Sequence, residues 1–196
     1  RSGADCDLVF DYILLLKSAG EYARALDETG ILLARSQNPF YRLVQADLLA
    51  ALGRHDGALD SYEQLVRDEL GSKNDLEMLG LVLGKYRRYL MTQLSAASAT
   101  ERFLSIVSRD INVASLLETA RFCEDQNQES EARGWYYRAY RTDYLTGGLA
   151  YARFLSARGE DRDCEKVMLY ILSNVKKGED LVHVASVILD ELGGMF

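Results

Sequence analysis

The sequence predicts an all-α fold, a right-handed superhelical solenoid of about five antiparallel helix pairs with a C-terminal capping helix. The segment Ala-Gly-Glu-Tyr-Ala-Arg-Ala-Leu at 19–26 returns as Leu-Gly-Arg-His-Asp-Gly-Ala-Leu at 52–59, so Gly20 and Gly53 stand 33 residues apart. Proline occurs once, at Pro39, which permits helices along most of the chain. A period of about 34 residues with a glycine at the turn is typical of helical hairpins that bury their apolar faces against each other.

Short breakers set the expected helix boundaries in order along the chain. The first helix has Leu8, Tyr12, Leu15 and Leu16 at helical spacing and ends at Gly20. Asn38-Pro39, Gly53, a loop over 71–74 and Gly159 separate later helices, and Asn74 or Asp75 is the expected cap of the fifth. The expected helices cover 5–19, 22–36, 40–52, 55–69, 75–94, 99–109, 113–125, 129–142, 146–158 and 161–176, followed by the capping helix at 179–192.

These helices group into repeats near 5–38, 39–71, 74–110, 112–143 and 145–177, within one domain that spans 1–196. The third repeat is expected to be irregular, because it has no turn glycine and its first helix is long. Ala58 and Ala132 stand 74 residues apart, two periods of 37, which places an insertion in this repeat.

Composition and charge exclude several classes of function. The net charge of −7 argues against a nucleic-acid binder, which would present excess lysine and arginine to phosphate. No apolar run is long enough to insert into a membrane, and no signal-peptide pattern is present. Cys6, Cys123 and Cys164 are few, odd in number and far apart, as expected for reduced thiols. We therefore expect a cytoplasmic protein.

Motifs of catalysis and cofactor binding are absent from the sequence. Gly80 to Lys85 reads G-x-x-x-G-K, but a phosphate-binding loop needs a longer spacing and a serine or threonine after the lysine. The two histidines, His55 and His183, stand far apart, and no metal-ligand spacing occurs. We expect no catalytic residues, no metal site, no cofactor and no enzymatic activity.

The residues that carry the repeat resemble the tetratricopeptide repeat (TPR) family in degenerate form. That family places small residues where the paired helices cross, a glycine at the turn and an aromatic residue on the second helix. The first two repeats match at Leu16, Gly20, Tyr22, Ala25 and Leu32, and at Ala46, Leu49, Gly53, Ala58, Tyr62 and Leu65. The last two match at Ala120, Ala132, Tyr136 and Ala139, and at Ala152, Leu155, Gly159, Cys164 and Met168.

The resemblance implies a protein-interaction scaffold or adaptor, whose first helices line a concave groove for a peptide or helix of a partner protein. The repeat register places these candidates on that face: Phe10, Leu14, Lys17, Leu43, Asp47, Ala50, Glu77, Leu81, Leu117, Arg121, Glu124, Leu149, Arg153 and Ser156. Arg121 and Arg153 share one register position and could bind carboxylates of an acidic partner; alternatively, they are solvated or paired with Glu118 and Glu124. A subset of the family binds the C-terminal carboxylate of chaperones, but Asp47 would repel that group, so we do not expect this mode.

A candidate secondary interface consists of Arg133, Tyr137, Arg141 and Tyr144, while Tyr136 and Tyr140 are expected in the core. Aromatic and arginine residues are enriched in protein interfaces and also suit RNA, or the set is an ordinary helix surface. Several apolar residues lie near the two ends of the sequence: Phe10, Ile13, Val187, Ile188, Met195 and Phe196. Either they are left uncovered and favour a homo-oligomer, or the end segments pack onto their own neighbours. The alternative to an adaptor is a structural or oligomerisation module of a larger regulatory protein or enzyme.

Overall fold

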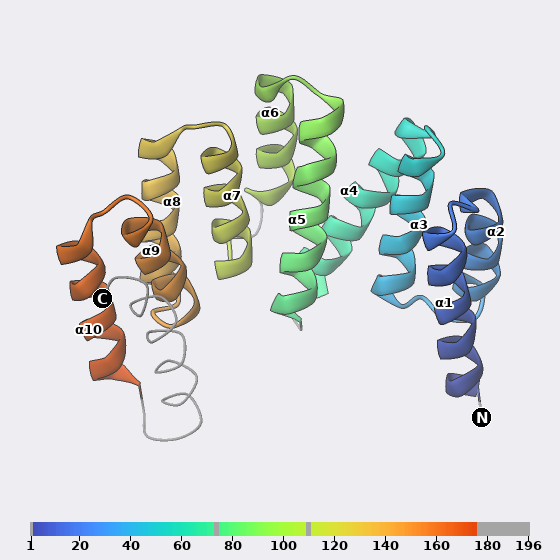
Figure 1. Ribbon diagram of the computed structural model, residues 1–196, viewed down its shortest axis with the longest axis horizontal. Helices are drawn as coiled ribbons and strands as arrows, with labels where there is room; N and C mark the ends of the chain where they lie inside the picture. Colours follow the sequence, from blue (N-terminus) through green and yellow to red (C-terminus); the bar gives the residue numbers. More distant parts are fainter. Residues whose placement is uncertain (1, 73–74, 109–110, 176–196) are drawn as a thin grey trace. The chain divides into compact units, whose positions relative to one another are not determined.

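The computed structural model describes residues 2–72, 75–108 and 111–175, which form ten α-helices and no strand (Figure 1). Five helices precede residue 96: α1 (Ser2–Ser18), α2 (Tyr22–Leu33), α3 (Pro39–Ala51), α4 (His55–Ser72) and α5 (Leu76–Gln93). Five follow it: α6 (Ala96–Val107), α7 (Val113–Asp125), α8 (Glu129–Thr142), α9 (Thr146–Ser156) and α10 (Asp161–Asn174). The predicted all-α fold is confirmed. The predicted capping helix at 179–192 lies outside the described residues.

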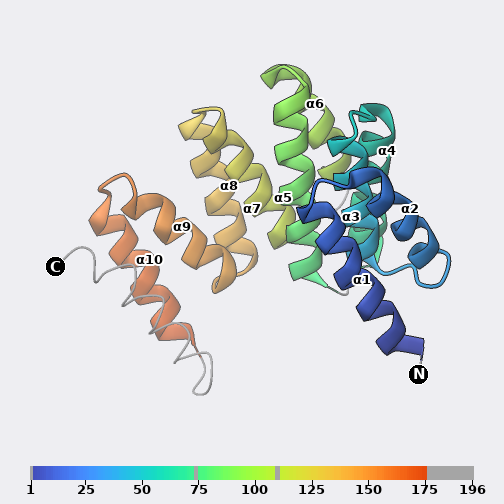
Figure 2. The same cartoon turned by 45° about the vertical axis from the view of Figure 1, so that its right-hand side comes forward.

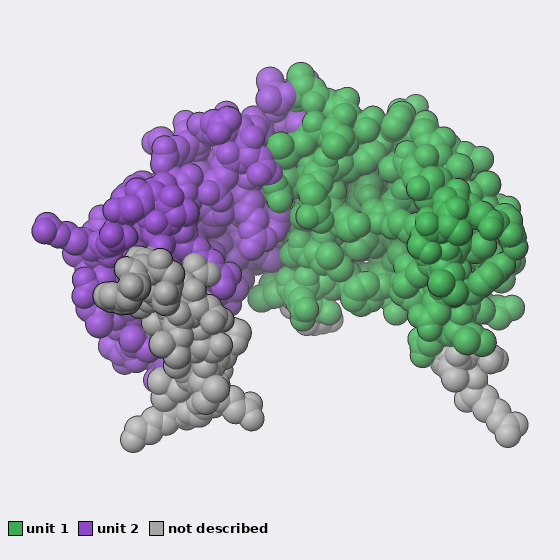
Figure 3. Space-filling view, in the orientation of Figure 1, with its two compact units in different colours: residues 1–95 green, residues 96–196 purple. Residues whose placement is uncertain are grey.

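The chain divides into two compact units, residues 1–95 and residues 96–196 (Figure 3). Unit 1 holds α1 to α5 and unit 2 holds α6 to α10, so the boundary falls inside the third predicted repeat, the one expected to be irregular. The helix before the boundary, α5, has 18 residues, two fewer than the range 75–94 expected from the sequence. The assignment of 1–196 to a single domain stays a prediction.

Four hairpin turns share one backbone conformation. Gly20, Gly53 and Gly159 have φ angles of 78°, 70° and 70°, and Asn127 has 56° at the equivalent place in the fourth repeat. In each turn this residue donates its N–H to the carbonyl three residues earlier, and the next residue donates to the carbonyl five residues earlier. These are the two bonds of a Schellman motif, which requires a left-handed residue. Asparagine tolerates that conformation better than most residues other than glycine, so Asn127 continues the repeat without a glycine.

Side-chain caps fix the start of several helices. Asn38 caps α3 through a bond from the backbone N–H of Phe40, and Pro39 occupies the first turn, where no N–H is needed. Of the two caps considered for α5, Asp75 is the one used, because its carboxylate accepts a bond of 2.8 Å from the N–H of Met78.

Small residues lie at the helix crossings, as the repeat pattern predicted. Ala25 and Ala46 are fully buried in unit 1, and so are Ala132 and Ala139 in unit 2. In unit 2, α7, α8, α9 and α10 pack in sequence order around Leu116, Leu155, Ile171 and neighbouring side chains (Figure 2). Near the start of the chain, Ile13 is fully buried and Phe10 is half-buried against Tyr41, so both pack onto their own neighbours. The other apolar residues considered for self-association lie outside the described part of the chain.

Candidate functional site

Four of the apolar residues predicted to line the groove pack inside the protein. Leu43, Leu117 and Leu149 are no more than 9% exposed, and Phe10 is half-buried with its ring 4.9 Å from that of Tyr41. These three leucines therefore pack in the core, and the function proposed below does not rest on them. Their side chains are buried among the adjacent helices instead of facing the solvent.

The next row in unit 1 contains a cluster of charged side chains that spans three helices. Asp47 of α3 accepts bonds from Lys17 of α1 at 2.7 Å and from Lys85 of α5 at 2.9 Å, both on Oδ2. The hydroxyl of Tyr62 on α4 donates to the other oxygen, Oδ1, at 2.5 Å. We call these four residues the lysine cluster. Lys17 and Lys85 lie 68 positions apart in the sequence, yet they share one carboxylate oxygen.

The electrostatics of the lysine cluster leave it with one excess positive charge. Burial alone would raise the pKa of Asp47, but the hydrogen bonds from Lys17, Tyr62 and Lys85 outweigh it and hold that pKa below its ordinary value. Burial and the Asp47 carboxylate together raise the pKa of Tyr62 far above its usual range, so the phenol remains a donor. Two ammonium groups therefore face a single carboxylate. Their attraction for the carboxylate of a partner outweighs the repulsion that Asp47 alone would exert on it.

The two lysines remain accessible, unlike the carboxylate between them. The side chains of Lys17 and Lys85 are 31% and 34% exposed, whereas that of Asp47 is 14% exposed. Each ammonium has three N–H donors and uses one of them on Asp47, which leaves donors for another acceptor. Leu14 and Leu81 lie on the same helix faces, three and four residues before the lysines, and are 41% and 39% exposed. The arrangement suits an acidic group flanked by apolar side chains.

In unit 2 the corresponding row is occupied by internal ion pairs. Arg121 bonds to Glu118 one turn earlier on α7, which was one of the alternatives open from the sequence. Glu124 accepts a bond of 2.5 Å from the hydroxyl of Tyr136 and lies 3.3 Å from Arg158. Arg153 is exposed on α9. Glu124 is therefore engaged by two partners within unit 2.

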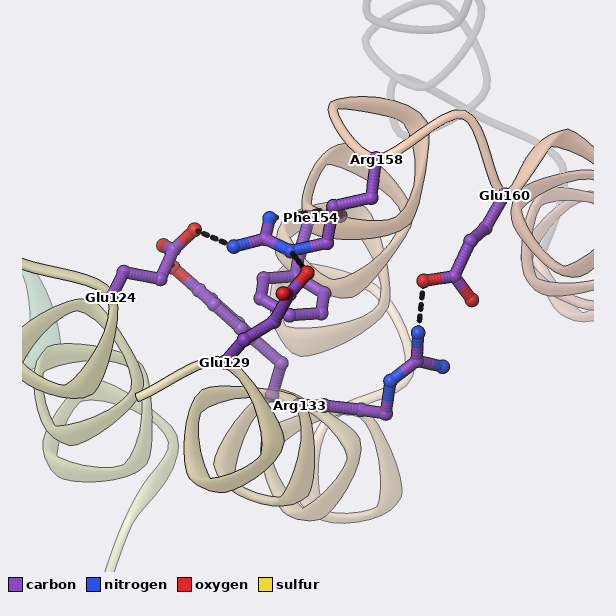
Figure 4. Close-up of polar contacts among 7 residues, drawn as sticks. Glu124, Glu129, Arg133, Phe154, Arg158 and Glu160 are labelled. Carbon is purple, nitrogen blue, oxygen red and sulfur yellow. Dashed lines mark hydrogen bonds and ion pairs between the residues drawn. The ribbon is translucent and has the colours of Figure 1, made fainter. Parts of the chain in front are cut away.

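Figure 4 shows how Arg158 joins three helices at one end of unit 2. Its guanidinium lies 3.7 Å above the ring of Phe154 and reaches both Glu124 and Glu129, the latter at 2.5 Å. Arg133 points the other way and pairs with Glu160 (Figure 4). This bond to Glu160 is the main reason that the pKa of Arg133 is raised. These contacts tie α7, α8 and the turn after α9 together, so we assign them to stability.

The candidate secondary interface is only partly available for a ligand. Arg133 is committed to Glu160, whereas Tyr137, Arg141 and Tyr144 are exposed on α8 and the turn after it. Tyr136 is buried, as predicted, but Tyr140 is only half-buried, which corrects its assignment to the core. Tyr170 of α10 is 50% exposed and its ring lies beside that of Tyr140. The sequence did not indicate this contact, because Tyr170 stands 30 positions after Tyr140 in the chain.

Among the described residues, no group of three or more histidine, cysteine, aspartate and glutamate side chains is arranged to hold a metal ion. No helix in the described ranges is both long and apolar enough to cross a membrane. Cys123 and Cys164 are buried and form no disulfide, and burial raises the pKa of the Cys123 thiol.

Neither a protein-family model nor a curated protein matches the sequence. Solved structures that resemble the chain include a thermophilic TPR protein of Thermus thermophilus, with a TM-score of 0.48, 18% identity and coverage of 94% of this chain and 99% of that chain. A putative kinesin light chain with TPR-like repeats from Podospora anserina gives a TM-score of 0.48 and 14% identity, and covers 97% of each chain. The TPR2AB domain of yeast Sti1, in complex with pHSP90, gives 0.38 and 10% identity over 96% of this chain and 99% of that chain. The four equivalent turns and the buried small residues identify the repeats of this chain as degenerate and TPR-like.

Proposed function

We propose that unit 1 binds an acidic segment of a partner protein, a peptide or a helix, across α1, α3 and α5. The observation that carries this proposal is the pair of partly exposed ammonium groups held on one carboxylate by three successive first helices. Their single excess charge attracts a carboxylate, and their spare N–H donors can bond to it. Leu14 and Leu81 supply apolar contact beside the charges.

The proposed role is binding and not catalysis. A general base needs a pKa near the working pH, whereas the pKa of Asp47 is lowered by three donors. We further propose that the protein acts in the cytoplasm, where reducing conditions keep cysteines such as Cys123 from forming disulfides. The whole chain carries a net charge of −7, so the local excess of positive charge sets where an acidic partner docks.

The test is a titration of the protein with a fluorescent peptide of alternating leucine and glutamate. Replacing either lysine, as Lys17→Gln or Lys85→Gln, is expected to weaken binding about fivefold, which is the effect of one partly screened charge. Binding should also weaken as salt concentration rises. The same peptide with glutamine in place of glutamate should bind weakly to every variant.

Lys166→Gln is the matched control, because Lys166 also pairs with an aspartate, Asp163 at 2.7 Å, but lies fully exposed on α10. The control variant should bind the acidic peptide as the unaltered protein does. Equal losses in all three lysine variants would indicate a general charge effect, and no loss in any would remove the lysine cluster from the proposed site.

A structural or oligomerising role is the second candidate, and exposed apolar residues of unit 1 favour it. Leu8 and Leu15 on α1 are 72% and 66% exposed, and Ile31 on α2 is 50% exposed. Sedimentation equilibrium should then detect a dimer that Leu8→Glu/Leu15→Glu converts to monomer. A protein that is strictly monomeric at all accessible concentrations excludes this candidate.

A further inference from the structure

The second helices of unit 2 contain a pocket that the proposed site does not use. It has a volume of about 290 Å³ and is lined by Tyr140, Arg141, Thr142, Tyr144 and Tyr170. We call it the tyrosine pocket. Its walls come from the last turn of α8, the turn after it and the outer side of α10.

The central ring of the pocket packs against other aromatic rings of unit 2. Tyr140 lies at the centre, 5.7 Å from Tyr170, 6.2 Å from Tyr137 and 6.1 Å from Tyr151, measured between ring centroids. Tyr151 in turn packs on Phe154, which is buried in the core of unit 2. Because Tyr140 already packs against three other rings, a ligand that packs on it orders few side chains.

The hydrogen-bonding groups of the pocket are mainly donors. Tyr144 donates to the carbonyl of Asn174 at 3.3 Å, and Thr142 donates to the carbonyl of Arg138, so these two are engaged. The hydroxyls of Tyr140 and Tyr170 and the guanidinium of Arg141 make no hydrogen bond to another described residue. Burial and the neighbouring phenols raise the pKa of Tyr140, which therefore stays protonated.

The charges around the pocket favour a ligand that carries an acidic residue. No carboxylate is among the described residues that line it. The nearest acidic residue in the sequence, Asp143, uses its carboxylate to accept the backbone N–H groups of Leu145 and Thr146. Arg138 lies 4.5 Å over the ring of Trp135, which leaves Arg141 as the arginine at the pocket itself.

We propose that the tyrosine pocket binds a proline-rich segment of a partner protein, with an acidic residue of that segment paired to Arg141. A proline-rich strand has no N–H at its prolines and keeps its backbone carbonyls free, so it offers acceptors to a surface that offers donors. Its pyrrolidine rings pack on aromatic walls, and its preformed extended conformation lowers the cost of ordering. A single-stranded RNA would need a basic track along its backbone, whereas Arg133 is already paired with Glu160.

The test is fluorescence anisotropy of the whole protein with a labelled peptide of consecutive prolines followed by glutamates. Tyr170→Ala and Arg141→Gln should each weaken binding about tenfold, since exposed aromatic and arginine residues dominate such interfaces. Arg138→Gln is the matched arginine control, and Tyr12→Ala removes a tyrosine of similar exposure, 41%, from unit 1. Both controls should bind the probe unchanged.

Two comparison peptides and one RNA complete the experiment. Replacing the prolines by glycine should abolish binding, and replacing the glutamates by glutamine should remove the effect of Arg141→Gln. The proposal is overturned if the glycine peptide binds equally, or if neither pocket variant changes the affinity. Binding of oligouridine that depends on Arg141, without binding of the proline peptide, would assign the pocket to RNA instead. Tyr170 and Arg141 are both exposed, so unchanged far-UV circular dichroism is expected for their variants.

Discussion

Replacing Gly147 with alanine is expected to lower the free energy of unfolding by roughly 3 kcal/mol or more, one of the largest effects available to a single methyl group. Gly147 is buried in the first turn of α9, where this helix meets the end of α8. A Cβ atom there would lie 2.2 Å from the carbonyl oxygen of Ala139 and 2.7 Å from the backbone nitrogen of Tyr140. Because both atoms belong to the backbone, the new methyl group can be accommodated only if the two helices move apart.

Gly134→Ala is the matched control for this prediction. Gly134 lies inside α8 with nothing within 4 Å of the place that a methyl group would take, so alanine should stabilise the helix by about 1 kcal/mol. Urea denaturation measures the change in the free energy of unfolding for both variants, and both substitutions lie in unit 2. A Gly147→Ala protein as stable as the unaltered one would show that α8 and α9 do not approach this closely.

Removing the charge of Asp47 is expected to strengthen binding of the acidic peptide, although it deletes a hydrogen-bonded residue of the proposed site. Asp47→Asn changes the charge of the lysine cluster from one positive to two, while its amide oxygen can still accept the bond from Tyr62. At about 1 kcal/mol for each partly screened charge, affinity should rise about fivefold. Neutralising all three charges, as Lys17→Gln/Asp47→Asn/Lys85→Gln, should weaken binding about fivefold instead.

The two Asp47 variants therefore differ about 25-fold in expected affinity, with the unaltered protein between them. A structural role for the cluster predicts a different order, because both variants would then lose contacts and bind more weakly. Isothermal titration with the leucine–glutamate peptide measures all three affinities. Thermal unfolding of each variant separates a loss of fold from a loss of binding.

The helices could be predicted from the sequence because each end carries its own local signal. Gly20, Gly53 and Gly159 take the left-handed conformation that their repeated spacing indicated, and Pro39 begins α3. Asn127 carries the same turn conformation, and its tolerance of a left-handed backbone was a usable but weak signal. Buried alanines such as Ala46 and Ala132 followed from the repeat because only small residues fit at the crossings.

The side chains of the candidate site were harder to predict, because they depend on contacts between distant helices. The repeat register assigned Lys17 and Asp47 to one face, whereas Lys85 belongs to the irregular repeat and was not assigned to it. Only the packing of α3 and α5 against α4 within unit 1 brings its ammonium to Asp47. The burial of Leu43 could not be predicted, because a repeat register gives the position of a residue along its helix but does not determine how deeply neighbouring helices bury its side chain.

The affinity of Asp47→Asn for the acidic peptide, relative to the unaltered protein, tests the proposed site most directly. If the exposed ammonium groups of Lys17 and Lys85 bind the partner's carboxylates, the variant binds about fivefold more tightly at low salt, and the gain shrinks as salt rises. An unchanged or weaker affinity in a folded variant would contradict the account, because the lysines would then not be the groups that hold the acidic segment.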